Sequence, residues 1–131
     1  MSYPVDHANY GYILSKRGDL DAAVEELAAA ETGLPGYPGL NYDMGRMLML
    51  LQRPSEALAR FEREMPISPG NAELFRRAGL AAQGMGDGNR ALRYLERHLV
   101  LAPDGPRSKE VRKTLESIRG GEVGHAYGGA R

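Results

Sequence analysis

Residues 45–69 read GRMLMLLQRPSEALARFEREMPISP, and residues 79–103 read GLAAQGMGDGNRALRYLERHLVLAP. When the two stretches are aligned, a glycine, an alanine, a bulky apolar residue and a proline fall in the same register. The same four kinds of residue precede them once more, and every step is 34 residues: Gly11, Gly45 and Gly79; Ala23, Ala57 and Ala91; Leu27, Phe61 and Leu95; Pro35, Pro69 and Pro103. A fixed period of this length indicates a protein built from three structural repeats.

The spacing within each repeat predicts a helical hairpin. Each repeat begins with a segment of helical periodicity, at about residues 4–17, 38–51 and 72–85, that carries the glycine in its middle. A glycine inside a helix costs about 0.5–1 kcal/mol relative to alanine, so its recurrence needs a packing reason. We expect the glycine to face the alanine of the second helix, which lets the two antiparallel helices approach closely. The proline then ends the second helix.

Several residues predict where individual helices begin and end. Pro66 lies inside the expected second helix of the second repeat, so we expect that helix to end near Met65. Pro38 predicts a proline in the first turn of the helix that follows it, and Asn71 predicts a side-chain N-cap.

This pattern resembles the tetratricopeptide repeat (TPR), a 34-residue helix–turn–helix unit with the same order of glycine, alanine, large apolar residue and proline. The resemblance covers about residues 4–105. It implies an all-α fold, a right-handed α-solenoid of three antiparallel helix hairpins with repeats at residues 4–37, 38–71 and 72–105.

Two features depart from the TPR pattern. The aromatic residue expected four positions before the glycine is present only as Phe75, because His7 and Asn41 stand there in the first two repeats. His98 occupies a position that is more often small, which predicts a looser contact with the segment that follows.

The C-terminal residues break the repeat register and predict a capping helix. Lys113 stands where the glycine would fall, and an apolar stripe recurs at helical spacing in Val111, Thr114, Leu115 and Ile118. We expect a helix over residues 106–119 to cover the last hairpin, so that residues 1–119 form a single domain. Residues 120–131 contain five glycines and predict a flexible Gly-rich tail.

The composition argues against an enzyme, a metal site and a cofactor. The chain has no cysteine, and its three histidines, His7, His98 and His125, form no i, i+4 pair. The glycine-rich residues 84–88 follow a helix and lack the Gly-Lys-Ser/Thr ending of a phosphate loop, so they predict a hairpin turn. We therefore predict a non-enzymatic protein without metal or cofactor.

Charge and hydropathy limit the classes of partner and the cellular location that the sequence predicts. The 17 basic and 17 acidic residues give no net field toward nucleic acid. The arginines of the third repeat share their helix with Glu96, and residues 60–64 of the second repeat alternate arginine with glutamate, so we predict no nucleic-acid partner. No apolar run reaches membrane-spanning length, and the N-terminal residues have no signal-peptide pattern. These features predict a cytoplasmic location and no membrane insertion.

The resemblance implies a binding surface, since the first helices of successive TPR units line a concave groove that holds a peptide or a partner helix. Helical geometry predicts the following groove residues: Tyr12, Lys16, Tyr42, Arg46, Met49, Arg76, Leu80 and Gln83. Tyrosine and arginine are enriched in binding hot spots, and methionine adapts to irregular apolar partners. Met49 and Leu50 fit a core position equally well, and a binding surface on the convex face stays open.

The resemblance also argues against one TPR subclass. The carboxylate clamp, which grips acidic chaperone tails, uses lysine, asparagine and arginine at defined positions of the first helices. At the corresponding positions of the second and third repeats this chain has Asp43, Glu73 and Arg77, of which only Arg77 fits the clamp.

The sequence therefore predicts a protein–protein interaction module that acts as an adaptor or scaffold. Two alternatives stay open. Residues 4–37 carry six acids and two bases and residues 106–131 carry six bases and three acids, which favours a head-to-tail homo-oligomer. Small three-repeat proteins also resemble secretion-type chaperones that bind a client protein.

Overall fold

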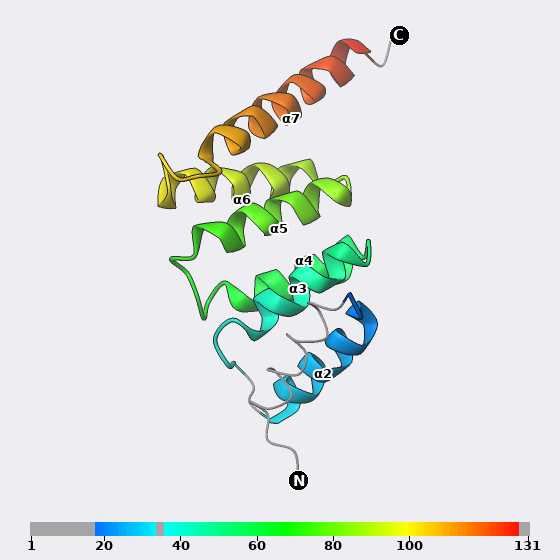
Figure 1. Cartoon of the computed structure of the whole chain (residues 1–131). Coiled ribbons are helices and arrows are strands. Elements are labelled where there is room, and N and C mark those ends of the chain that lie inside the picture. The colour runs from blue at the N-terminus through cyan, green and yellow to red at the C-terminus, as the bar shows by residue number, and fades with distance from the viewer. Residues whose placement is uncertain (1–17, 34–35, 129–131) are drawn as a thin grey trace. The chain divides into compact units, whose positions relative to one another are not determined.

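The computed structural model of the chain describes residues 18–33 and 36–128, with side chains described through Gly121. The described residues form helices and no strand (Figure 1): α2 (Leu20–Gly33), α3 (Leu40–Leu50), α4 (Pro54–Glu64), α5 (Ala72–Gly84), α6 (Gly88–Leu101) and α7 (Ser108–Gly128). The all-α prediction is confirmed. The expected helix at residues 4–17, with Tyr12 and Lys16, lies outside the described residues.

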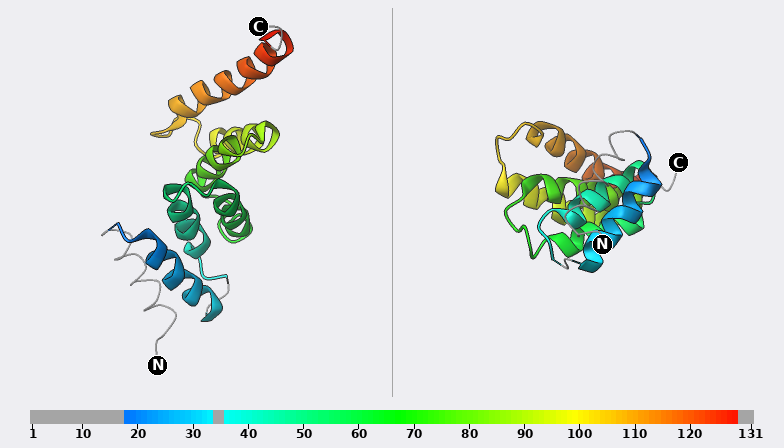
Figure 2. Two further views of the ribbon diagram at one scale, coloured as in Figure 1. Left: turned by 90° about the vertical axis from the view of Figure 1, so that its right-hand side faces the viewer. Right: turned by 60° about the horizontal axis from the view of Figure 1, so that its bottom comes forward.

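The chain divides into two compact units, residues 1–69 and residues 70–131, which we call the N-terminal and C-terminal units. In the N-terminal unit α3 packs against both α2 and α4, and in the C-terminal unit α6 packs against both α5 and α7. The hairpins α3–α4 and α5–α6 can be followed in two further views (Figure 2).

The repeated glycines lie where two helices make their closest contact. A Cβ atom added at Gly45 would lie 2.4 Å from the ring of Phe61, and one added at Gly79 would lie 2.6 Å from Cγ of Leu95. The glycine therefore accommodates the bulky residue of the second helix, a contact that the spacing did not indicate. Ala57, one turn earlier on α4, is fully buried.

Each unit has an apolar core between its helices. In the N-terminal unit the core joins α2 and α3 through Ala23, Leu27, Ala30, Leu40, Met44 and Met47. In the C-terminal unit Val111 and Leu115 of α7 are buried against Leu95 of α6, with Ile118 partly buried beside them. The apolar stripe of the predicted capping helix therefore covers α6.

The helix ends agree with the sequence in part. Helix α4 ends at Glu64, with Met65 as its C-cap, as Pro66 predicts. The Asn71 side chain accepts a hydrogen bond from the Leu74 N–H at 3.2 Å, which confirms the predicted N-cap. The expectation for Pro38 is wrong, because α3 begins only at Leu40, after Gly39 has taken a left-handed conformation with φ of 88°.

Helix α7 begins at Ser108 and continues beyond residue 119 to Gly128. This course differs from the sequence interpretation, which starts the flexible tail at residue 120. Glycine lowers helix propensity by about 1 kcal/mol per residue but does not forbid a helix, and no proline follows Pro106. No helix in the described part of the chain is both long and apolar enough to cross a lipid bilayer.

Candidate functional site

The predicted groove residues of the N-terminal unit share one face of α3. Tyr42, Arg46 and Met49 are spaced i, i+4 and i+7, which places them on one side of the helix. The Tyr42 ring is half-buried and lies 6.1 Å from the Phe61 ring, centroid to centroid. The Arg46 guanidinium carbon lies 5.7 Å from the Tyr42 ring centroid, so the cation stacks over an aromatic face that is itself held by packing.

The C-terminal end of this face is apolar and accessible. Leu50 is 67% exposed, so it is not part of the core. Met49 is half-buried beside it. Together with Arg46, which is exposed, these side chains give α3 a surface that mixes apolar and cationic groups. The sequence left a core role open for both Met49 and Leu50, and the structure excludes it for Leu50.

Asp43 adds an acid to this surface. One of its carboxylate oxygens lies 3.9 Å from Arg46 Nη1, in a pair that is largely open to water. Burial raises the pKa of Asp43 above 3.8, the Arg46 charge lowers it and the Glu64 charge raises it further, and the net direction is upward. Arg46 therefore has an acidic neighbour without being locked to it.

The predicted groove residues of the C-terminal unit also share one face, on α5. Arg76, Leu80 and Gln83 have the same i, i+4, i+7 spacing, with Leu80 half-buried and Gln83 exposed. Arg76 is less accessible than its counterpart on α3, since its side chain is 13% exposed and its Nε donates to Oε1 of Glu73 at 2.5 Å. Part of its hydrogen-bonding capacity is thus used within α5.

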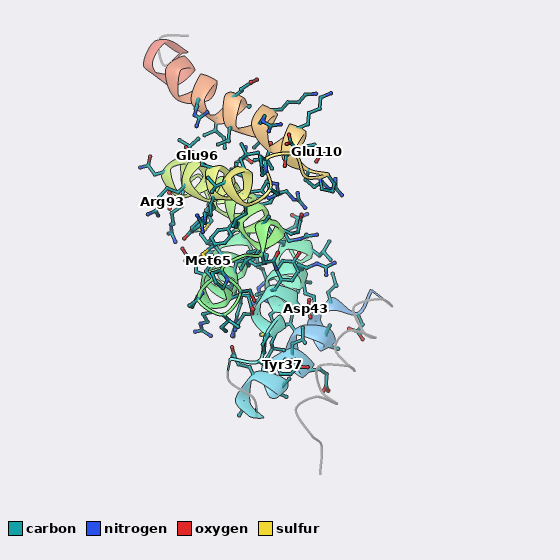
Figure 3. All side chains as sticks on the ribbon, turned by 90° about the vertical axis from the view of Figure 1, so that its left-hand side faces the viewer. Tyr37, Asp43, Met65, Arg93, Glu96 and Glu110 are labelled. Atoms are coloured by element: carbon teal, nitrogen blue, oxygen red, sulfur yellow. The ribbon has the colours of Figure 1, made fainter. Side chains whose placement is uncertain are left out.

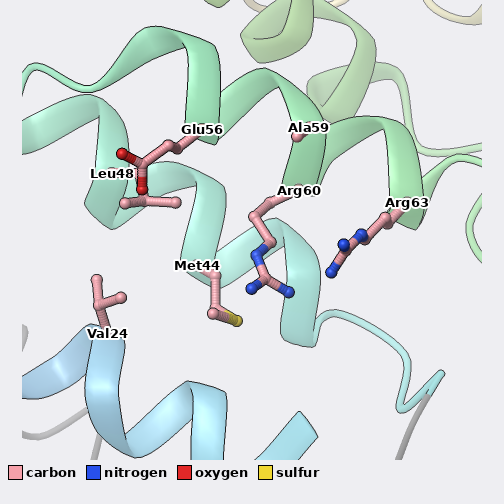
Figure 4. Close-up of a pocket in the computed structure, with 7 residues that line it drawn as sticks. All are labelled: Val24, Met44, Leu48, Glu56, Ala59, Arg60 and Arg63. Atoms are coloured by element: carbon pink, nitrogen blue, oxygen red, sulfur yellow. The ribbon is translucent and has the colours of Figure 1, made fainter.

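A pocket of about 230 Å³ in the N-terminal unit lies between α2 and α4 (Figure 4). Its floor is apolar, with Val24 from α2 and Met44 and Leu48 from α3. Arg60 on its rim donates to both carboxylate oxygens of Glu31, at 2.6 and 2.7 Å. Because this guanidinium already holds α4 to α2, the pocket is better explained as the space between two packed helices than as a ligand site.

The sequence did not indicate two buried polar residues that occupy the same repeat position. Glu64 is fully buried, and its Oε2 accepts hydrogen bonds from the Gly39 N–H at 3.0 Å and the Ser68 hydroxyl at 2.7 Å. His98, which follows it by 34 residues, is 3% exposed, and its Nδ1 lies 2.7 Å from the Ala72 carbonyl oxygen. Each side chain thus joins a second helix to the start of a first helix. The looser contact expected between His98 and the segment that follows it stays a prediction.

Among the described residues, no cluster of histidine and acidic side chains is arranged to hold a metal ion.

No protein-family model and no curated protein matches the chain. Solved structures do match it. The first TPR of Spaghetti (RPAP3) bound to HSP90 peptide SRMEEVD has a TM-score of 0.82 and 18% identity, covering 92% of this chain and 93% of that one. The Arabidopsis OM64 TPR domain has a TM-score of 0.80 and 18% identity, covering 87% and 94%. The Sgt2 TPR domain from Aspergillus fumigatus has a TM-score of 0.80 and 19% identity, covering 98% and 83%.

These similarities extend over nearly the whole of this chain and concern domains of one kind. Their low identity means that they report on the backbone arrangement and not on the residues of a binding surface. The agreement with the 34-residue period is independent of them, because the period is read from the sequence alone. The chain therefore has the tetratricopeptide-repeat fold.

Proposed function

We propose that this chain is a non-enzymatic protein–protein interaction module that binds a peptide or a partner helix on the first helices of its repeats, and so acts as an adaptor or scaffold. The observation that carries the proposal is the pair formed by Tyr42 and Arg46 on α3, an aromatic ring and a cation stacked at the surface. The likeness to a TPR bound to an HSP90 peptide supports a peptide or protein as the kind of partner.

The α3 surface has the physical properties of a binding hot spot. Tyrosine and arginine contribute large contact areas and directional donors, and hot spots are enriched in both. Packing of Tyr42 against Phe61 holds the ring before any partner arrives, so little side-chain entropy is lost on binding. Met49 and Leu50 add apolar area at the end of the same helix. A partner segment with an apolar side chain and a hydrogen-bond acceptor matches this surface.

The acidic C-terminal tail of a chaperone is not the partner that we propose. Asp43 and Glu73 stand at positions where the carboxylate clamp has neutral or basic residues, so the side-chain donors that grip such a tail are missing at both positions. The likeness to the HSP90-peptide complex supports a peptide as the kind of partner, and not that particular ligand.

A pull-down from lysate of the source organism tests the proposal. We expect wild-type protein to capture a partner that a Tyr42→Ala/Arg46→Ala double variant does not. The chain offers a matched control on α6, where the Arg93 guanidinium carbon lies 5.8 Å from the Tyr94 ring centroid and that ring lies 6.2 Å from Phe75. The Arg93→Ala/Tyr94→Ala variant removes the same chemistry from a second helix and should keep the partner.

Three other outcomes have definite meanings. Loss of the partner from the α6 variant alone would contradict the proposal and place binding on second helices. If both variants lost the partner equally and had a lowered melting temperature, the loss would result from unfolding of the chain and not from a change in its binding surface. Capture of the chain alone, unaffected by either variant, would favour a self-associating scaffold.

A further inference from the structure

A second pocket lies wholly within the C-terminal unit and is lined by a concentration of positive charge. It has a volume of about 520 Å³ and lies between the first turn of α5, the end of α6 and the residues that lead into α7. Its lining side chains include three arginines, Arg76, Arg77 and Arg107, against one carboxylate, that of Glu73. The lining therefore carries a net positive charge, although the whole chain is neutral.

The one carboxylate in the pocket is largely neutralised by its neighbours. Glu73 pairs with Arg76 and lies 3.7 Å from Nε of Arg77. Burial acts to raise the pKa of Glu73, but the hydrogen bond and charge of Arg76, with the charges of Arg77 and His98, lower it below 4.5 overall. Arg107 pairs with Glu110 at 3.3 Å, and both side chains are more than half exposed, so water competes for that pair. Glu110 lies in the first turn of α7 (Figure 3).

His98 supplies a polar atom that the fold itself does not satisfy. His98 lines the pocket and is 3% exposed, and its Nε2 is buried without a hydrogen-bond partner among the described residues. Because the Ala72 carbonyl can only accept, Nδ1 must donate to it. Nε2 is then an acceptor in the neutral ring and a donor in the protonated ring. A buried polar atom left in this state is costly unless a ligand can pair with it.

Backbone groups at the pocket reinforce its preference for an anion. Ala72 and Glu73 are the first two residues of α5, and Arg107 directly precedes α7. The first N–H groups of a helix have no partner within the helix, and the helix dipole places positive potential there. Two helix starts therefore meet the same three arginines.

We propose that this pocket binds a phosphate group, carried by a phosphorylated side chain of a partner protein. Donors approach from α5, from α6 and from the residues before α7, which suits a tetrahedral group with three acceptor oxygens better than a planar carboxylate. A phosphate monoanion also has one O–H, so it can donate to Nε2 of neutral His98 or accept from the protonated ring, whereas a carboxylate can only accept. The inference rests on the proposed function only for the source of the phosphate.

Titration of the full-length chain with inorganic phosphate, followed by amide NMR, tests the site without any partner. We expect saturable shifts at the starts of α5 and α7, and we expect acetate to bind at least about tenfold more weakly. Arg107→Ala should weaken phosphate binding about fivefold, whereas Lys109→Ala removes the same charge two residues away, outside the pocket lining, and should change it less than about twofold. Glu73→Gln removes the one carboxylate of the pocket lining and should tighten binding about threefold.

Each alternative result contradicts the phosphate site. Equal weakening by Arg107→Ala and Lys109→Ala would mean attraction by overall charge. Acetate binding as tightly as phosphate would assign the pocket to carboxylates. Absence of shifts near residues 72–77 and 107 would leave the pocket without this ligand. Because the probe is a free anion, these results stand whether or not the α3 surface captures a partner.

Discussion

The hairpins α3–α4 and α5–α6 occupy equivalent repeat positions, yet they differ in the residues that hold those positions together. Both hairpins place a glycine against a bulky apolar side chain, whereas their polar positions use different chemistry. Four pairs, each 34 residues apart, show this: Gly45 under Phe61 and Gly79 under Leu95; Glu64 and His98; Arg53 with Glu56 and Asp87 with Arg90; Gln52 and Gly86. The apolar residues that recur every 34 positions thus determine the hairpin, whereas the polar residues form different hydrogen bonds and ion pairs in each hairpin. Substitutions that alter these apolar and polar positions, or exchange residues between the hairpins, test this distinction.

The largest effect is expected at the glycine contacts. A Cβ at Gly45 would lie 2.4–2.8 Å from three atoms of the Phe61 ring, and a ring that is fully buried cannot rotate away as an aliphatic side chain can. Gly45→Leu should therefore lower the free energy of unfolding by about 3 kcal/mol or more, measured by urea denaturation. Gly45→Ala should also destabilise, despite the better helix propensity of alanine.

Two glycines provide the controls for this prediction. Gly79→Ala meets the more adaptable Leu95 side chain and should cost less than Gly45→Ala. Gly120→Ala, in α7 with no atom within 4 Å, should stabilise by about 0.5–1 kcal/mol through helix propensity alone. If all three alanine variants stabilised the chain, the close approach of α3 to α4 would be wrong.

The next largest effect is expected at Glu64, the fully buried acid. Glu64→Ala, which copies Ala30 of the first repeat, leaves the Gly39 N–H and the Ser68 hydroxyl without their acceptor. We expect a loss of about 1–3 kcal/mol in the free energy of unfolding. Glu64→Gln keeps one acceptor oxygen and removes a buried charge, so its loss should be less than half as large. A glutamine variant as unstable as the alanine variant would show that the charge itself stabilises the unit.

Much of the fold was predictable because its determinants are local or periodic. The 34-residue spacing requires only the sequence, and Pro66 and Asn71 act on their own helix through a missing donor and a side-chain cap. The partner of the repeated glycine was not predictable in this way. Whether Gly45 faces Ala57 or Phe61 depends on the rotation of one helix against the other, which spacing along the chain does not determine.

The candidate sites were predictable only where one helix contains the whole pattern. The i, i+4 spacing of Tyr42 and Arg46 was sufficient to place them together. Arg76 has the same spacing to Leu80, but its pairing with Glu73 uses part of its hydrogen-bonding capacity. Their i, i+3 spacing permits this pair, whereas the exposure that remains to Arg76 depends on the side-chain conformations and on the neighbouring elements. His98 was missed because its Ala72 partner lies 26 residues away.

A smaller effect is expected from the ion pairs at the starts of the second helices. In the C-terminal unit Asp87 caps α6, accepting from the Arg90 N–H at 3.1 Å and from Arg90 Nε at 2.7 Å. The N-terminal unit has the same pair with its charges reversed, and Arg53 provides no side-chain cap for α4. The double exchange Arg53→Asp/Glu56→Arg keeps the ion pair and adds a side-chain cap, while the acid and the base exchange places at the start of α4. It should raise the free energy of unfolding by about 0.5–1 kcal/mol.

The pH dependence of this cap provides a second measurement. The backbone and side-chain hydrogen bonds from Arg90 hold the pKa of Asp87 below 3.8. A carboxyl group whose pKa is lowered by folding stabilises the protein above its unfolded-state pKa, and that contribution disappears as the pH falls through the folded-state value. Asp87→Asn can still accept the Arg90 N–H and should therefore show a shallower loss of stability below pH 3.8 than wild type. An identical acid profile for the two proteins would mean that the ionisation of Asp87 does not contribute to stability.

The smallest effect is expected at Gln52, the single described residue other than glycine with a positive φ, at 59°. The equivalent turns before α2 and α6 use Gly18 and Gly86, with φ of 83° and 78°. A left-handed conformation costs a residue with a side chain about 1–2 kcal/mol, but glycine also loses more backbone entropy on folding, which offsets part of that gain. Gln52→Gly should therefore stabilise by only about 0.5 kcal/mol in urea denaturation. Gly86→Gln has open space for its side chain, so any loss of stability there measures the backbone term alone. If neither substitution changed the free energy of unfolding, the conformation of this turn would not contribute to the difference in stability between the two hairpins.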